Sequence, residues 1–84
     1  MSGEVTVRTY RRARHIIGEK ELTRKIEPNA DVRGLLDDLS ASYDLNPEEC
    51  IVMVNGRNIN QLDGRLTSLS NGDLVVIAVD PSPD

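Results

Sequence analysis

The sequence predicts a single α+β domain in which a sheet of four or five strands packs on one helix. Two observations lead to this prediction. Four short segments either alternate between apolar and polar residues or are continuously apolar, as strands are. Between the second and third of them, apolar residues recur at helical spacing. With 84 residues, the chain is long enough for one small domain and too short for a deep catalytic cavity.

The first two strands are predicted to form a hairpin. Residues 5–10 alternate in polarity, with the period of two that fits a half-buried strand. Residues 11–17 then turn the chain, and Gly18 gives the backbone the freedom to reverse. The second strand is expected over residues 21–26.

One amphipathic helix is expected after Pro28, which ends the second strand. Asp31 is a suitable N-cap, because its carboxylate can accept a hydrogen bond from a backbone N–H of the first turn. Gly34 costs about 1 kcal/mol relative to alanine and is expected to permit a close approach to the sheet. Packing on the sheet buries the apolar stripe, which consists of Val32, Leu35, Leu36, Leu39 and Tyr43.

The C-terminal half is predicted to contain a tight hairpin. A third strand over residues 51–54 leads into Asn55-Gly56, a strong signal for a two-residue turn because both positions of that turn need positive φ. A brief return strand should follow around residues 58–62.

The last strand is predicted at residues 74–79, where six consecutive apolar residues are typical of a central strand. The loop before it contains Asp63-Gly64 and Asn71-Gly72-Asp73, which are turn signals. Between these turns, Leu66 and Leu69 are expected to reach the core.

The composition argues against several classes of protein. A net charge of −4 disfavours sequence-independent binding of nucleic acid, although eight of the ten basic residues lie within the first 33. No apolar run approaches the roughly 20 residues of a membrane span, and no signal peptide is evident, so we predict a cytoplasmic protein. Eight arginines, two lysines and an acidic balance resemble haloarchaeal composition. Cys50 is alone among apolar neighbours, which predicts an inert buried thiol and excludes an internal disulfide.

Four short motifs, in their order and spacing, carry a resemblance to a known group of proteins. They are Arg14-His15-Ile16-Ile17-Gly18, Asp31-Val32, Val54-Asn55 and Gly72-Asp73. The chain resembles the ubiquitin-like β-grasp proteins over nearly its whole length, and most closely the sulfur carriers of the MoaD/ThiS type and the archaeal small modifiers. The resemblance implies a mixed sheet with the first and last strands adjacent, a domain over residues 1–80 and a flexible tail over residues 81–84.

The C-terminus departs from this family. The resemblance implies a terminal Gly-Gly that an activating enzyme adenylates, whereas Pro83 and Asp84 occupy that position here. Proline fixes φ and lacks an N–H, and Asp84 brings a Cβ and a second carboxylate into a site shaped for glycine. We therefore expect that Asp84 is not efficiently adenylated.

The face of the sheet away from the helix is the first candidate site. Alternation places one residue set of each strand on this face, and the resemblance implies that ubiquitin-like proteins present this face to partners. Apolar patches commonly mark such surfaces, although scattered exposed residues or a one-residue error in strand phase would remove the patch. The predicted partner-binding face consists of Arg8, Tyr10, Met53, Leu74, Val76 and Ala78.

A basic cluster at the end of the first hairpin is the second candidate site. It could bind RNA or another anion, or an acidic protein partner. Against RNA, only two tyrosines are available for base stacking. The cluster could equally be a solvated hairpin end that pairs with Glu19 and Glu21. It consists of Arg11, Arg12, Arg14, His15 and Lys20.

No residue pattern predicts catalysis. His15 is the single histidine, without a neighbouring triad partner or a metal-ligand spacing. Asp37-Asp38 and Glu48-Glu49 are adjacent in sequence, so each pair fits solvated charge better than a site that aims two carboxylates at one point. We therefore predict no enzyme activity, no metal and no cofactor.

These observations predict a monomeric module that binds protein partners non-covalently. One alternative is a sulfur carrier or modifier activated at a different native C-terminus, whose partners would be an activating enzyme and a molybdopterin-synthase-like or thiolation partner. Another is a small RNA-associated module that uses the loop from Arg11 to His15. RNA affinity that falls steeply with salt would support the last alternative.

Overall fold

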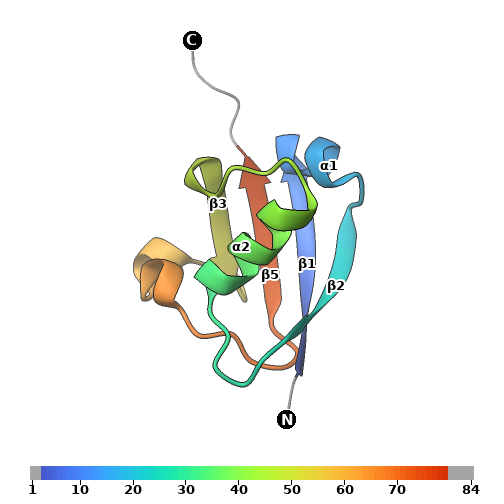
Figure 1. Cartoon of the computed structure of the whole chain (residues 1–84). Helices are drawn as coiled ribbons and strands as arrows, with labels where there is room; N and C mark the ends of the chain where they lie inside the picture. The colour runs from blue at the N-terminus through green and yellow to red at the C-terminus, as the bar shows by residue number, and fades with distance from the viewer. Residues whose placement is uncertain (1–2, 80–84) are drawn as a thin grey trace.

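Five strands form one mixed sheet, and the longer of two α-helices lies across one of its faces (Figure 1). The computed structural model describes residues 3–79, so the predicted tail over residues 81–84 lies outside the described part. The strand order is β2-β1-β5-β3-β4, with β1 and β5 parallel and the other neighbours antiparallel. This architecture confirms the predicted α+β fold and gives the sheet five strands. The strands are β1 (Gly3–Arg11), β2 (Glu21–Ile26), β3 (Cys50–Val54), β4 (Arg57–Asn58) and β5 (Leu74–Val79), and the α-helices are α1 (Arg12–Ile17) and α2 (Val32–Ser42).

The core lies between α2 and the facing side of the sheet. In the three central strands every second residue is buried, which is the period of two that the sequence predicts. The predicted helix stripe is confirmed for four of its members, while Tyr43 is the half-buried C-cap of α2. The core contributions of these elements are Val5, Val7 and Thr9 from β1, Val52 and Val54 from β3, Val75, Ile77 and Val79 from β5, and Val32, Leu35, Leu36 and Leu39 from α2.

The segment after β1 is a helix and not simply a turn. Arg11 adopts a φ of 57°, and α1 follows at once. Ala13 and Ile17 lie four residues apart and are both buried, which anchors this helix on the sheet. Gly18, in the left-handed conformation, ends α1 by donating its N–H to the carbonyl of Arg14 at 2.7 Å.

The loop between β4 and β5 contains one clear error of prediction. Leu69 is buried as expected, whereas Leu66 is 65% exposed. Leu66 ends a 3₁₀ helix, η3 (Gly64–Leu66), and the next residue, Thr67, takes the inward position. The Thr67 hydroxyl donates to the Gly64 carbonyl at 2.6 Å, and the backbone carbonyl of Thr67 accepts from Val32 N–H at 3.0 Å.

The return strand after the hairpin turn is shorter than predicted. β4 spans only two residues, and the chain then enters the 3₁₀ helix η2 (Ile59–Gln61). The turn itself has the predicted chemistry, because Asn55 and Gly56 have φ angles of 51° and 86°.

The Asn55 and Asp73 side chains connect this turn to the start of β5. Asn55 Oδ1 accepts from Leu74 N–H at 2.9 Å, and Asn55 Nδ2 donates to Asp73 Oδ1 at 3.0 Å. The other Asp73 oxygen, Oδ2, accepts from Ser70 N–H at 2.8 Å. The motifs Val54-Asn55 and Gly72-Asp73 therefore meet in one hydrogen-bonded network.

Gly34 does not approach the sheet, contrary to the expectation. It is exposed in the first turn of α2, where its N–H donates to Asp31 Oδ1 at 2.9 Å and confirms Asp31 as the N-cap. A Cβ at this position would meet only Asp31 Oδ1, at the ordinary contact distance of 3.4 Å.

Replacing Gly34 with alanine should therefore stabilise the protein. Gly34→Ala is expected to raise the free energy of unfolding by about 0.5–1 kcal/mol, because alanine loses less backbone entropy in a helix. Urea denaturation followed by circular dichroism measures the change. Gly72→Ala is the contrasting variant, since Gly72 also has open space but a φ of 89°, which strains any residue with a Cβ. Destabilisation by Gly34→Ala would contradict this account.

Candidate functional site

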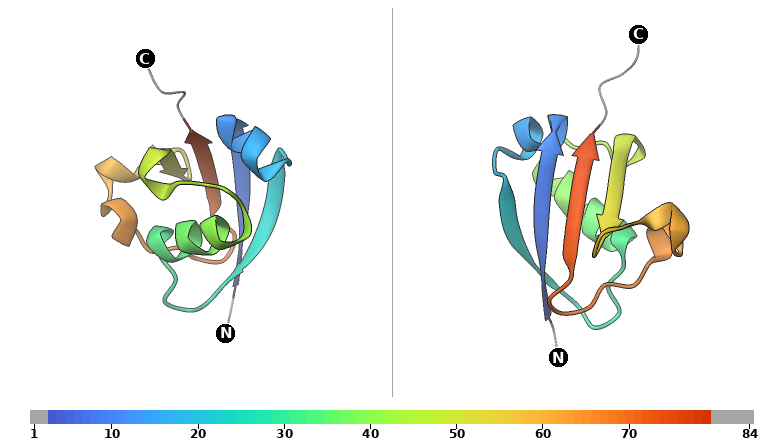
Figure 2. Two further views of the ribbon diagram at one scale, coloured as in Figure 1. Left: turned by 45° about the horizontal axis from the view of Figure 1, so that its top comes forward. Right: turned by 180° about the vertical axis from the view of Figure 1, so that it is seen from behind.

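The sheet face opposite α2 carries the candidate site. Seen from behind, β1, β5 and β3 lie side by side with no helix in front of them (Figure 2). The buried residues of these strands point toward α2, so the intervening residues face outward. In the described part of the chain, this face is therefore where the central strands meet solvent.

The centre of this face is a row across three strands. Val76 of β5 lies opposite Arg8 of β1 on one side and Met53 of β3 on the other. Val76 and Met53 are partly exposed, and Arg8 is exposed. Because residues directly opposite on neighbouring strands have adjacent side chains, these three form one continuous surface.

A second row lies nearer the C-terminal end of β5. Ala78 is opposite Tyr10 on β1 and Ile51 on β3. Tyr10 and Ile51 are 40% and 39% exposed, which makes them two of the large apolar side chains that the described chain leaves open. Ile51 is absent from the predicted face, although the alternation that turns Met53 outward turns Ile51 outward too.

The structure thus brings all six predicted face residues to one side of the sheet. Leu74, the remaining member, lies opposite Thr6 at the start of β5 and is partly exposed. The predicted strand phase is the one observed. Their role in binding a partner stays a prediction. From here on, the open face denotes Arg8, Tyr10, Ile51, Met53, Leu74, Val76 and Ala78.

The charge at the edge of the open face is partly compensated. Arg8 Nη2 lies 3.1 Å from the Glu21 carboxylate on β2, and both side chains are exposed. Hydrogen bonding to Glu21, and secondarily to Tyr10, raises the pKa of Arg8 above its ordinary value. Arg8 is therefore a basic residue of the predicted face that a carboxylate already orients.

The predicted basic cluster does not converge on one point. Arg14 turns back onto β1, where its Nη2 donates to the Thr9 carbonyl at 3.3 Å and its guanidinium lies 5.8 Å from the centre of the Tyr10 ring. Arg14 therefore supports Tyr10 and is half-buried. The other members, Arg11, Arg12, His15 and Lys20, are exposed along the hairpin end.

Cys50 is half-buried and not buried as the sequence predicts. As the first residue of β3 it lies at the end of the sheet, where its thiol donates to the Asn46 carbonyl at 3.4 Å. Burial raises the pKa of this thiol, which disfavours the reactive thiolate. Within residues 3–79, no three His, Cys, Asp or Glu side chains are grouped closely enough to hold a metal ion.

Comparison with known proteins identifies the family of this chain. A model of the ThiS family matches residues 7–78. The chain belongs to the ThiS family. As a ThiS family member, it has the ubiquitin-like β-grasp fold that the sequence motifs predict. No helix in the described part of this ThiS family protein has the length and hydropathy that crossing a bilayer requires.

Relatives of this ThiS family protein include archaeal modifiers. It is 30% identical to small archaeal modifier protein 3 of Haloferax volcanii, with 88% of this chain and 91% of the relative covered. The solution structure of the Haloferax volcanii HVO 2177 protein superposes with a TM-score of 0.84 at 26% identity, covering 99% of this chain and 88% of the other. The solution structure of small archaeal modifier protein 1 from Methanosarcina acetivorans gives a TM-score of 0.80 at 23% identity, with coverage of 100% and 99%, and shares the fold.

The family attachment position of this ThiS family protein was predicted at Pro83 and Asp84. Both residues lie outside the described residues. β5 ends at Val79, which is the last residue that the structure describes. The described geometry of the site is accordingly that of the open face.

Proposed function

We propose that this ThiS family protein is a non-enzymatic module that binds a protein partner through its open face. The observation that supports this most directly is the apolar surface formed by Val76, Met53, Ala78, Ile51 and Tyr10 on adjacent strands. A contiguous apolar surface on a small soluble domain is typical of a partner interface. The proposal rests on residues within 8–78 and does not depend on the chemistry of the chain's end.

The open face favours a protein over RNA as its ligand. Apart from Arg8, its side chains carry no charge, and Arg8 is paired with Glu21. Tyr10 is its single aromatic ring, and Arg14 lies over that ring. Single-strand binding needs several stacking rings and unpaired cations.

Val76→Glu should weaken partner binding strongly, with little effect on folding. Val76 occupies the middle of the central row, where a glutamate would bury an unpaired charge at the interface, so we expect affinity to fall by about tenfold or more. The matched control is Leu66→Glu, which places the same charge on an exposed leucine off the open face. Tagged proteins purified under native conditions from the host, with quantitative mass spectrometry of bound proteins, measure the effect. Equal recovery of partners with the two variants would contradict the proposal.

A carrier or modifier that uses its C-terminus is the second candidate, favoured by the 30% identity to small archaeal modifier protein 3. Purification under denaturing conditions separates the two functions. We expect no covalent adducts and an unmodified Asp84 carboxylate in the C-terminal peptide. A thiocarboxylate, an isopeptide-linked protein, or ATP–pyrophosphate exchange with a cognate activating enzyme would instead establish the carrier or modifier function.

A further inference from the structure

The strand β2 is an open edge of the sheet. Among the described residues β2 pairs only with β1, and the other edge is the two-residue β4. Long edge strands expose unpaired backbone groups that can template another strand. β2 is therefore the longer of two strands to which an extended segment could be added.

The hydrogen bonds of β1 identify which β2 groups point outward. Thr9 N–H donates to the Lys20 carbonyl, whereas Thr6 N–H donates away from β2 to Asp73. Alternation along an antiparallel pair then directs the backbone groups of residues 22, 24 and 26 toward β1. The N–H and C=O groups of Thr23 and Lys25 face the free edge.

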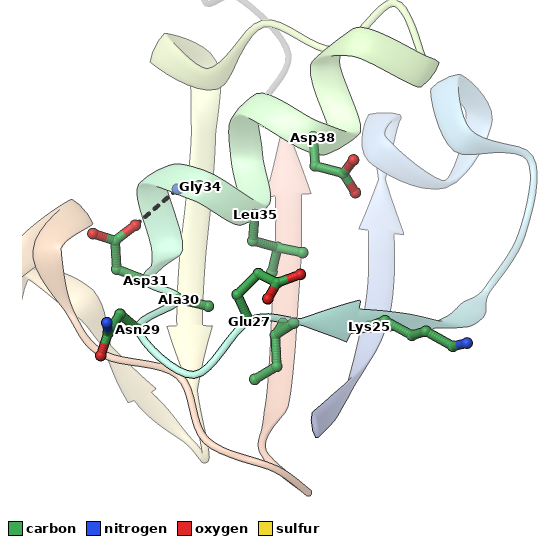
Figure 3. Close-up of a pocket in the computed structure, with 9 residues that line it drawn as sticks. Lys25, Glu27, Asn29, Ala30, Asp31, Gly34, Leu35 and Asp38 are labelled. Carbon is green, nitrogen blue, oxygen red and sulfur yellow. Dashed lines mark hydrogen bonds between the residues drawn. The ribbon is translucent and has the colours of Figure 1, made fainter. Parts of the chain in front are cut away.

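A groove of about 460 Å³ runs beside this edge, between the end of β2 and the first half of α2 (Figure 3). Its apolar lining comes from Ile26, Ala30 and Leu35. Gly34 forms part of the helix wall and leaves it without a side chain. The groove can therefore accept an apolar side chain from a strand laid along β2.

The charges that line the groove are mostly negative. Besides Lys25, three carboxylates line it, of which Asp31 caps α2 and Asp38 lies 3.6 Å from Arg24. The Glu27 carboxylate is exposed and, among the described residues, has no hydrogen bond or ion pair. A cation on the incoming strand would complement Glu27.

From this combination we propose that β2 binds an extended segment of a protein partner by strand addition. Main-chain hydrogen bonds form at Thr23 and Lys25, and an apolar side chain of the segment enters the groove over Ile26 and Leu35. Because side chains two residues apart share one face of a strand, a lysine or arginine two positions along would lie near Glu27. This site is separate from the open face, so the protein would hold two partners, or two parts of one partner.

The test selects peptides from a phage-display library of random short sequences on the full chain. Gly34→Gln fills the groove at an exposed helix position, and Ala41→Gln is the control at an exposed α2 position outside the groove lining. We expect enriched peptides with an apolar residue and a lysine or arginine two positions along, which bind Gly34→Gln about tenfold or more weakly than Ala41→Gln. A synthetic copy of the best peptide should shift the amide NMR signals of Thr23, Lys25 and Gly34.

Besides a failure to enrich any peptide, three binding results would overturn the proposal. They are peptides without a basic residue, equal binding by the two glutamine variants, and loss of binding in Val76→Glu, which would transfer the site to the open face. Failure to enrich any peptide above background would mean that the charged side chains of β2 protect the edge and that it does not pair. Because Val76→Glu tests the open face independently, the two proposals can fail separately.

Discussion

Leu39→Ala should lower the free energy of unfolding by about 2–5 kcal/mol, the largest loss expected from a single substitution in this protein. Leu39 is 0% exposed and is among the largest side chains that the core encloses completely. It lies on α2 against the central strands, where truncation removes buried methyl groups and leaves a cavity. Urea denaturation followed by circular dichroism measures the change, since the chain has no tryptophan for fluorescence.

Leu66→Ala provides the matched control for this prediction. The same atoms are removed from a side chain that is 65% exposed, so stability should change by no more than about 0.5 kcal/mol. A small loss at Leu39 would mean that the packing of α2 on the sheet is wrong. A large loss at Leu66 would mean that the loop before β5 packs inward, as the sequence alone predicts.

The composition makes this core sensitive to such truncations. The chain has no phenylalanine and no tryptophan, so the core is aliphatic. Each buried aliphatic side chain contributes roughly 1.5–3 kcal/mol, against a total stability of only about 5–15 kcal/mol for a domain. Losing one of them should therefore remove a large share of the stability.

The sheet and α2 are predictable because their patterns are strictly periodic. Alternation in β1, β3 and β5 reports which residues face α2, and the helical stripe reports which side of α2 meets the sheet. The same periodicity yields the open face, because that face is the complement of the core positions. Ile51 shows the limit of reading the pattern: it has the phase of Met53 and was assigned only to a strand.

The parts that sequence reasoning missed depend on tertiary contacts. α1 has six residues, which is too short for periodicity to distinguish it from a turn, and Ala13 and Ile17 show their role only when the sheet is present. Leu66 is apolar, but the local choice between it and Thr67 is made by the Thr67 hydrogen bonds. The groove beside β2 is lined by residues between positions 25 and 38 that come from a strand, a loop and a helix, so no single sequence motif predicts it.

Asp73→Ala should cost about 2 kcal/mol of stability, the second largest loss that we expect. The Asp73 carboxylate accepts from Asn55 Nδ2 and from Ser70 N–H, and each hydrogen bond to a charged group contributes roughly 1.5–3 kcal/mol before partial exposure reduces it. Its loss removes one of the hydrogen bonds between the β3–β4 turn and the start of β5. The control is Asp63→Ala, because the Asp63 side chain makes no capping hydrogen bond at η3 and its removal should change stability by less than about 0.5 kcal/mol.

A double-mutant cycle with Asn55→Gly isolates the contact between the two side chains. Glycine suits the φ of 51° at position 55, so this variant removes the side chain without adding backbone strain. Asn55 Oδ1 also accepts from Leu74 N–H, and that bond survives in Asp73→Ala. We therefore expect the double variant to lose about 1 kcal/mol less stability than the sum of the two single losses. It should still lose more than Asp73→Ala alone, because it also loses the bond to Leu74 N–H. Strict additivity in urea denaturation would show that the Asn55–Asp73 hydrogen bond contributes nothing in solution.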